Sequence, residues 1–171
     1  MSDSDFRPMR RADRQTGLDD AKTILHSCET GFLGVIGDNG YPYVIPMDFY
    51  YDNSDCDDSG HSIYFHSALK GHKIDAIEAG SKACFSVVSE ATVLPDVLSI
   101  AFSSVTVFGK AYVVTGSQEK KQALHHLFDK YILGKGKLTA KDGAEYIEEH
   151  FAQTAVIKME IQHMTGKRRV G

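Results

Sequence analysis

Residues 64–77, YFHSALKGHKIDAI, concentrate anion-binding side chains where a strand pattern gives way to a helix pattern. Five of them can donate to an anion or neutralise it: His66, Ser67, Lys70, His72 and Lys73. Gly71 lets the backbone approach a ligand, and the first N–H groups of the helix are unpaired. The segment predicts a phosphate-type site. A plain strand-to-helix turn with solvated side chains is the alternative, since no GxxxxGK[ST] loop occurs.

Other motifs for protein-borne catalysis are weak. His66 ends a strand and has the chemistry of an acid, a base or a ligand, although a structural histidine is the commoner outcome. His125 and His126 are adjacent on a predicted helix and point about 100° apart, so they cannot share one metal ion. Residues 55–66 resemble a calcium loop, but His66 stands where a bidentate glutamate is required, so we exclude calcium. We predict no metal site.

Composition narrows the class of protein. The 171 residues, 42% of them hydrophobic, suffice for one domain over residues 1–171 with its own core. A net charge of −4 offers no general attraction to nucleic acid or to an anionic membrane. No apolar run approaches the roughly 20 residues of a membrane-spanning helix. With no signal pattern and three cysteines without a CxxC, a cytoplasmic location is expected.

The first half of the chain predicts a helix and then mostly strands. Residues 1–14 are expected to be loose, and residues 18–28 have helical spacing behind two aspartates. FLGVI and YPYVIPMDFYY flank Asn39 and Gly40, which favour a hairpin turn. SIYFHS is the next predicted strand, a short helix carrying Ile74 and Ile77 follows, and then the strand ACFSVVS.

The second half predicts a long strand, two helices and a closing strand. LSIAFSSVTVFGKAYVV is too long for one flat strand, and Gly109 suggests a bulge within it. Ser117 is expected to cap an amphipathic helix, and a weaker helical pattern covers AEYIEEHF. AVIKMEIQ alternates as a strand, and GKRR at residues 166–169 is expected to fray, although it has the charge to serve an anionic ligand at a subunit boundary. Consecutive strands joined by short turns favour an antiparallel barrel with external helices.

These segments together resemble a known family. The chain resembles the pyridoxamine-phosphate-oxidase-like FMN-binding split barrels and, within them, the nitroimidazole-resistance (Nim-type) proteins. The resemblance is carried by MRRADR, GFLGVIGDNGYPYVIPMDFYY, IYFHSALKGHKIDAI, FSSVTVFGKA and IQHMTGKRR, in the family's order. It implies a mainly β fold with flanking helices, an antiparallel split β-barrel. Ser103, where relatives often carry a basic residue, and EATVLPD, expected as a loop, depart from the pattern.

The resemblance also implies a homodimer that holds FMN between its subunits. The residues that it assigns to cofactor binding are Ile45, Pro46, Met47, His66, Ser67, His72, Lys73 and Ser104. Ser67 and Lys73, helped by His72, would hold the phosphate, and residues 45–47 would lie along the isoalloxazine ring. His66 would be the catalytic residue, positioning or protonating the acceptor.

The expected function is that of an FMN-dependent oxidoreductase. It would take electrons from NADH or NADPH and reduce nitroimidazole or a related small nitroaromatic compound. The flavin carries the electrons in such an enzyme, so no protein nucleophile is needed. The alternatives are a flavin- or haem-binding module without turnover, a site for a deazaflavin, and pyridoxamine-phosphate-oxidase-like activity.

Overall fold

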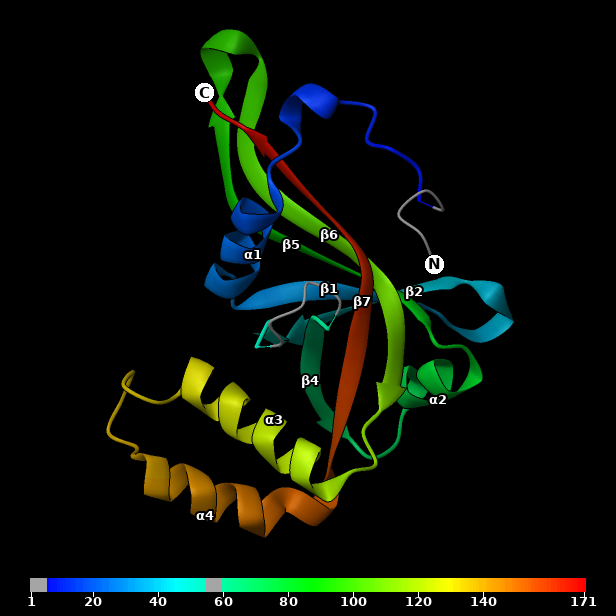
Figure 1. The fold of residues 1–171 in the computed structure, drawn as a ribbon, viewed down its shortest axis with the longest axis vertical. Coiled ribbons are helices and arrows are strands. Elements are labelled where there is room, and N and C mark those ends of the chain that lie inside the picture. The colour runs from blue at the N-terminus through cyan, green and yellow to red at the C-terminus, as the bar shows by residue number, and fades with distance from the viewer. Residues whose placement is uncertain (1–5, 55–59) are drawn as a thin grey trace.

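A computed structural model describes residues 6–54 and 60–171, and it places seven strands in one antiparallel sheet (Figure 1). The strands are β1 (Thr30–Ile36), β2 (Pro42–Asp48), β3 (Tyr50–Asp52), β4 (Ser62–Ala68), β5 (Lys82–Leu94), β6 (Ser99–Val113) and β7 (Thr154–Arg169). They lie in the order β2-β1-β5-β6-β7-β4-β3. Because only Phe49 separates the two edge strands β2 and β3 in the chain, the sheet must curl until its edges meet. The predicted split β-barrel is confirmed.

The inside of the barrel is filled by alternate side chains of the strands. Phe85 makes edge-to-face contacts with Phe49 and with Phe65, at centroid distances of 4.8 and 5.2 Å. On β6, Val105 and Val107 are fully buried, whereas the residues between and beside them are more exposed. This two-residue period is what the β-branched and aromatic sequence predicts for strands with one face in a core.

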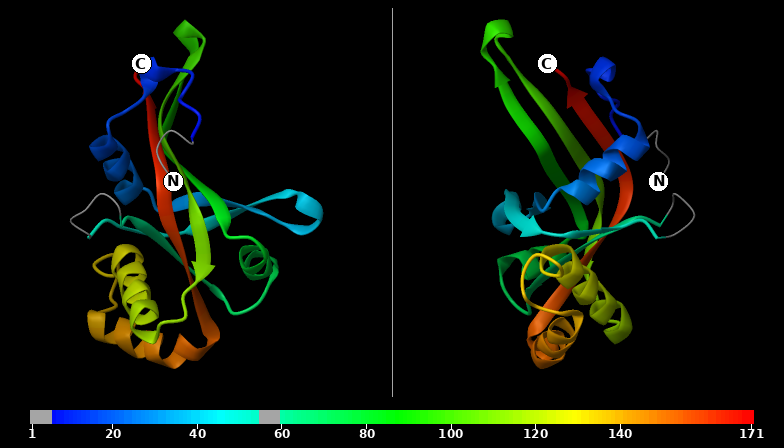
Figure 2. Two further views of the ribbon diagram at one scale, coloured as in Figure 1. Left: turned by 45° about the vertical axis from the view of Figure 1, so that its right-hand side comes forward. Right: turned by 90° about the vertical axis from the view of Figure 1, so that its left-hand side faces the viewer.

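Four helices lie outside the sheet (Figure 2). They are α1 (Leu18–Ser27), α2 (His72–Ala79), α3 (Ser117–Tyr131) and α4 (Ala140–His150). Helix α1 packs on β5, β6 and β7, α2 packs beside β1 and β6, and α3 packs on β3, β4 and β7 with α4 against it. The predicted order of helices and strands is confirmed except that YPYVIPMDFYY, expected as one strand, forms two, β2 and β3, at opposite edges of the sheet. Ser117, expected to cap α3, is instead its first helical residue, because Gly116 occupies the cap position.

The long segment after residue 98 is a single strand with a bulge where the sequence suggested one. The register between β6 and β7 shifts at Phe108 and Gly109. A Cβ atom at Gly109 would lie 2.0 Å from the carbonyl oxygen of Glu160, so only glycine permits this approach. The bulge lets one strand of 15 residues follow the curved sheet.

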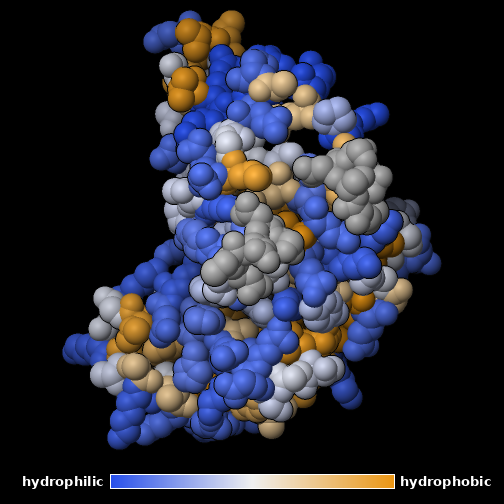
Figure 3. Space-filling view, in the orientation of Figure 1, coloured by the Kyte–Doolittle hydropathy of each residue, from blue (hydrophilic) through white to orange (hydrophobic). Residues whose placement is uncertain are grey.

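Strands β5 and β6 continue past their neighbours as a projecting arm, which is at the top of Figure 1. Residues 90–94, expected as part of a loop, are paired strand, and the turn is confined to residues 95–98. Hydrophobic side chains gather at its tip in Figure 3, including Val93, 69% exposed, and Leu98, 96% exposed with φ 49°. The loop expectation was wrong because alternation along EATVL is weak and both faces of the arm are exposed.

Both ends of the described chain are more ordered than the sequence suggested. Residues 167–169 pair with β6 as the end of β7, so the expected frayed tail is wrong. Phe6 stacks on His163 at 4.5 Å, and residues 12–14 form a short 3-10 helix. Residues 1–5 and 55–59, which include the first five residues of the segment considered for calcium, lie outside the described residues. Within the described ranges no helix is long and apolar enough to cross a membrane.

Candidate functional site

The junction between β4 and α2 contains a buried hydroxyl group with no partner. Ser67 is the last inward-facing residue of β4 and is 7% exposed. Its Oγ has no hydrogen-bond partner in the part of the chain that the structure describes. Because an unsatisfied buried hydroxyl costs roughly 1–3 kcal/mol, such a group indicates a missing ligand or water.

Lys73, in the first turn of α2, supplies a cation at the same place. Its Nζ lies 3.5 Å from Sδ of Met47, a weak acceptor, and within residues 6–54 and 60–171 it makes no ion pair. Burial lowers the pKa of Lys73, since the charged form loses solvation. A bound anion would offset this loss of solvation, because its negative charge would stabilise the protonated form of Lys73.

The start of α2 completes an anion-binding mouth, which we define by Ser67, Gly71 and Lys73. Gly71 has φ 133°, which lets the chain turn from β4 into the helix, and no side chain caps the helix start. Met47, which Lys73 contacts, is on β2, and β2 packs against β4, the strand that carries Ser67. The N–H groups of the first turn therefore open beside a hydroxyl and an ammonium group, an arrangement suited to phosphate.

Residues 45–47 do not share one face of the sheet. Met47 is buried beside Lys73, and Ile45 is half-buried against the core, whereas Pro46 points outward. Ser104 is on the outer face of β6, because its neighbours Ser103 and Val105 are buried. Of the predicted ring-binding residues, Pro46 and Ser104 therefore lie on the outside of the barrel.

This outer sheet face is broad and partly apolar. Phe32, Val44 and Val88 are each more than half exposed on β1, β2 and β5, at 52, 59 and 54%. Strand pairing places Phe32 opposite Pro46, and Val88 opposite Ser104. A contiguous exposed face of this kind is a site for another surface or for a planar ligand.

The two predicted histidines lie elsewhere. His66 is exposed on the opposite face of β4 from Ser67 and lines a cavity beneath α3 and α4. His72 stacks on Tyr43 at 4.1 Å, and its Nε2 is 3.6 Å from the carboxylate of Asp38. The structure therefore brings Lys73 to Met47 and places Ser67 near the end of the strand that leads into α2, whereas His66 faces the other side of β4 and the ring of His72 stacks on Tyr43.

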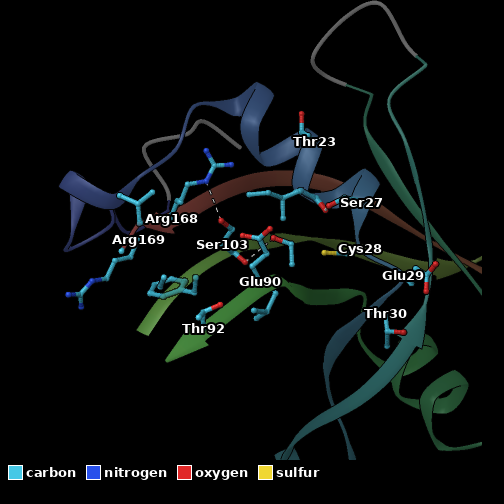
Figure 4. Close-up of a pocket in the computed structure, with 17 residues that line it drawn as sticks. Thr23, Ser27, Cys28, Glu29, Thr30, Glu90, Thr92, Ser103, Arg168 and Arg169 are labelled. Carbon is cyan, nitrogen blue, oxygen red and sulfur yellow. Dashed lines mark hydrogen bonds between the residues drawn. The ribbon is translucent and has the colours of Figure 1, made fainter. Parts of the chain in front are cut away.

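A further groove was not predicted. It has a volume of about 1010 Å³ between α1, the arm and the end of β7 (Figure 4). Arg168 donates from Nε to Oγ of Ser103 at 3.2 Å and lies 3.7 Å from the carboxylate of Asp20. IQHMTGKRR does not alternate hydrophobic and polar residues, so the sequence carried no clear signal that β7 extends this far. We take the anion-binding mouth as the stronger candidate site, because its hydroxyl group is buried and unsatisfied, whereas this groove is broad and open and one of its two arginines, Arg168, is already paired.

Comparison with known sequences supports the fold. The sequence profile of the family described as pyridoxamine 5'-phosphate oxidase matches residues 18–168. The chain belongs to this family. Among curated proteins, none matches it significantly.

Solved structures share the fold of this family member at low sequence identity. A candidate 5-nitroimidazole antibiotic resistance protein from Bacteroides thetaiotaomicron VPI-5482 is 22% identical with a TM-score of 0.67, over 88% of this chain and 83% of that one. The flavocytochrome Anf3 from Azotobacter vinelandii is also 22% identical, with a TM-score of 0.73, over 99% of this chain and 75% of that one. The FAD and haem binding protein from Mycobacterium smegmatis is 20% identical, with a TM-score of 0.70, over 92% of this chain and 74% of that one.

Proposed function

We propose that this chain is a flavin-dependent oxidoreductase that holds the flavin phosphate in the anion-binding mouth. The observation that carries the proposal is the buried Ser67 hydroxyl, which has no partner among the described residues, at the junction where Lys73 begins α2 and bonds to a thioether. Both groups are stabilised when an anion with several acceptor oxygens binds. The residues present therefore fit a phosphate group.

FMN is the form of flavin that we propose. Its single terminal phosphate matches one hydroxyl, one cation and one helix start. The Mycobacterium smegmatis structure, described as binding FAD and haem, makes FAD the alternative. In either case the flavin would accept and donate the electrons, while the protein would fix the ring and exclude water.

The outer sheet face is the proposed location of the ring and of a second copy of the chain. Phe32, Val44 and Val88 supply exposed apolar area, and Pro46 and Ser104 lie among them. A homodimer with flavin between its subunits would cover this area. His66, on the outer side of β4, keeps its proposed role of positioning or protonating the acceptor.

A nitroimidazole or a related nitroaromatic compound is the proposed acceptor, and NADH or NADPH the proposed donor. Support for the acceptor comes from the Bacteroides structure, whose description concerns 5-nitroimidazole resistance. A cytoplasmic location is part of the proposal, supported by the free thiols of Cys28 and Cys84.

A flavin- or haem-binding module without turnover is the second candidate. It is favoured by two comparison structures, one described as a flavocytochrome and one as binding FAD and haem. Oxidation of NADH or NADPH by flavin-loaded protein with a nitroimidazole separates the two. Steady turnover supports the enzyme, and bound flavin that neither nucleotide reduces supports the module.

The phosphate assignment is tested by titrating flavin-free protein with FMN, FAD and riboflavin, which lacks the phosphate. We expect FMN to bind at least about tenfold more tightly than riboflavin, since charge-assisted hydrogen bonds to the phosphate are lost. FAD binding as tight as FMN binding would support the alternative cofactor. Equal affinities for FMN and riboflavin would contradict a phosphate anchor at Ser67 and Lys73.

A further inference from the structure

The arm, the end of β7 and the N-terminal segment lie together at the end of the molecule away from α3 and α4 (Figure 1, Figure 2). Gln15 bridges to Lys167, and β7 stays paired with β6 as far as Arg169. We define the arm pole as residues 6–16, 90–103 and 166–171. None of these residues belongs to the anion-binding mouth or to the cavity that His66 lines.

The tip of the arm exposes a group of hydrophobic side chains. They are Val93, Val97, Leu98 and Ile100, which are 69, 62, 96 and 48% exposed. Figure 3 shows hydrophobic side chains gathered at this projecting end of the molecule. An apolar group at a projecting tip indicates contact with another surface.

Leu98 has a strained backbone conformation at this tip. Its φ and ψ are both 49°, in the left-handed region that glycine adopts freely and leucine rarely. The side chain is almost fully exposed, so packing within the described chain does not account for a leucine at this position. Backbone strain that no internal contact explains points to a binding role for the side chain.

The arm pole is basic, although the whole chain is acidic. It has seven basic and three acidic side chains, a net charge of +4, and because the whole chain has −4 the remainder has −8. The basic residues are Arg7, Arg10, Arg11, Arg14, Lys167, Arg168 and Arg169, and the acidic residues are Asp13, Glu90 and Asp96. Arg11 pairs with Asp13, and Arg168 lies 3.7 Å from Asp20 of α1. The other arginines of the arm pole form no ion pair within residues 6–54 and 60–171, so their charge is available to a partner.

We propose that the arm pole docks on the surface of an anionic membrane. The apolar tip enters the boundary between headgroups and acyl chains, and the arginines lie against the lipid phosphates. Charge complementarity selects this partner, because the surface attracts the positive end of the chain and repels the negative remainder. A small apolar anchor holds weakly by itself, so stable attachment needs the basic residues as a second signal. The proposal does not depend on the flavin site.

Two other partners match only part of the arm pole. Nucleic acid would engage the arginines but would leave Val93, Val97 and Leu98 in water. A second copy of the chain, docked symmetrically through the arm pole, would bring two net charges of +4 together. An anionic lipid surface satisfies both the apolar tip and the positive charge.

The chain has no tryptophan, so a single introduced tryptophan reports on its own position. Leu98→Trp places the reporter at the tip, and Tyr41→Trp, at a position 73% exposed on the β1–β2 hairpin, is the matched control. The probes are vesicles of phosphatidylglycerol and phosphatidylcholine in equal parts, and vesicles of phosphatidylcholine alone. With the anionic vesicles, the emission of Leu98→Trp should shift to shorter wavelength and be quenched by lipids brominated on their acyl chains, whereas Tyr41→Trp should show neither effect. Binding to phosphatidylcholine alone should be at least about tenfold weaker.

Three variants, measured by co-sedimentation with the anionic vesicles, separate insertion and charge from folding. Leu98→Gly removes the side chain and relieves the positive φ, so it should weaken binding roughly tenfold or more without lowering the melting temperature. Leu138→Gly, at a leucine 53% exposed just before α4, should bind as the wild type does. Replacing Arg10 and Arg14 together with glutamine should weaken binding about tenfold or more at low salt, and less at high salt.

Equal binding to the two kinds of vesicle, or an unchanged affinity in Leu98→Gly, would overturn the proposal. A shift of the Leu98→Trp emission that appears without vesicles and grows with protein concentration would overturn it as well, because a second copy would then cover the tip. So would binding to double-stranded DNA that is tighter than binding to the anionic vesicles and unaffected by Leu98→Gly, since the arginines would then serve nucleic acid.

Discussion

Replacing Lys73 with alanine removes the only full charge of the anion-binding mouth. Within residues 6–54 and 60–171 the Nζ group makes one hydrogen bond, to the weak acceptor Met47 Sδ, so the substitution costs the folded chain little. When flavin phosphate is bound, the same ammonium group would make a charge-assisted hydrogen bond worth about 1.5–3 kcal/mol. The expected loss of FMN affinity is therefore roughly 10- to 100-fold in Kd.

The assay is fluorescence titration of FMN, and of riboflavin in parallel, into flavin-free protein. Lys70→Ala is the matched control, because Lys70 is an exposed lysine of the same turn and lies outside the mouth. Lys73→Ala should weaken FMN binding strongly and riboflavin binding hardly at all, and higher salt should reduce the difference. Equal weakening of both ligands would show that Lys73 supports the fold rather than the phosphate. Unchanged FMN affinity would refute the reasoning outright.

Three further predictions concern the fold. Gly109→Ala should destabilise the protein by about 3 kcal/mol in chemical unfolding, because its Cβ would lie 2.0 Å from the carbonyl oxygen of Glu160; a loss below about 1 kcal/mol would contradict the bulge geometry. Leu98→Gly should raise the melting temperature, since Leu98 holds φ 49° at roughly 1–2 kcal/mol and its side chain is 96% exposed; a lower melting temperature would show that the side chain makes a needed contact. Burial lowers the pKa of Lys130 to about 8 from 10.5, so between these pH values the unfolded chain binds more protons than the folded chain and stability contributed by this group rises with pH. Urea unfolding at pH 8 and pH 10 should show this rise in the wild type relative to Lys130→Met, and parallel pH profiles would contradict it.

The fold was largely predictable because its signals are local. The two-residue alternation on β1 and β7, the Asn39–Gly40 turn and the 3.6-residue stripe of α3 each require a few neighbouring residues only. Gly109 was a usable signal because glycine within a β-branched strand commonly marks a bulge. The arm at residues 90–94 was not predictable in this way, since both of its faces are exposed and it is held mainly by pairing with β6.

The candidate site was predictable in part. The glycine between a strand and a helix indicated the mouth, and Ser67 and Lys73 lie there. Residue type alone could not show in which direction the imidazole rings of His66 and His72 point. Because side chains alternate on β4, a buried Ser67 turns His66 outward, and the stacking of His72 on Tyr43 depends on a hairpin far away in the sequence. The cavity that His66 lines beneath α3 and α4 was missed for the same reason, because two helices and the ends of three strands meet there.

The central claim is that the anion-binding mouth holds a flavin phosphate. Its most direct test is the visible absorption spectrum of the purified protein after incubation with FMN and removal of the unbound FMN. Acid then releases the bound chromophore, which is identified and quantified. We expect a flavin spectrum with close to one FMN released per chain, and a large drop in that ratio for Lys73→Ala. A protein that stays colourless and takes up no added flavin would contradict it.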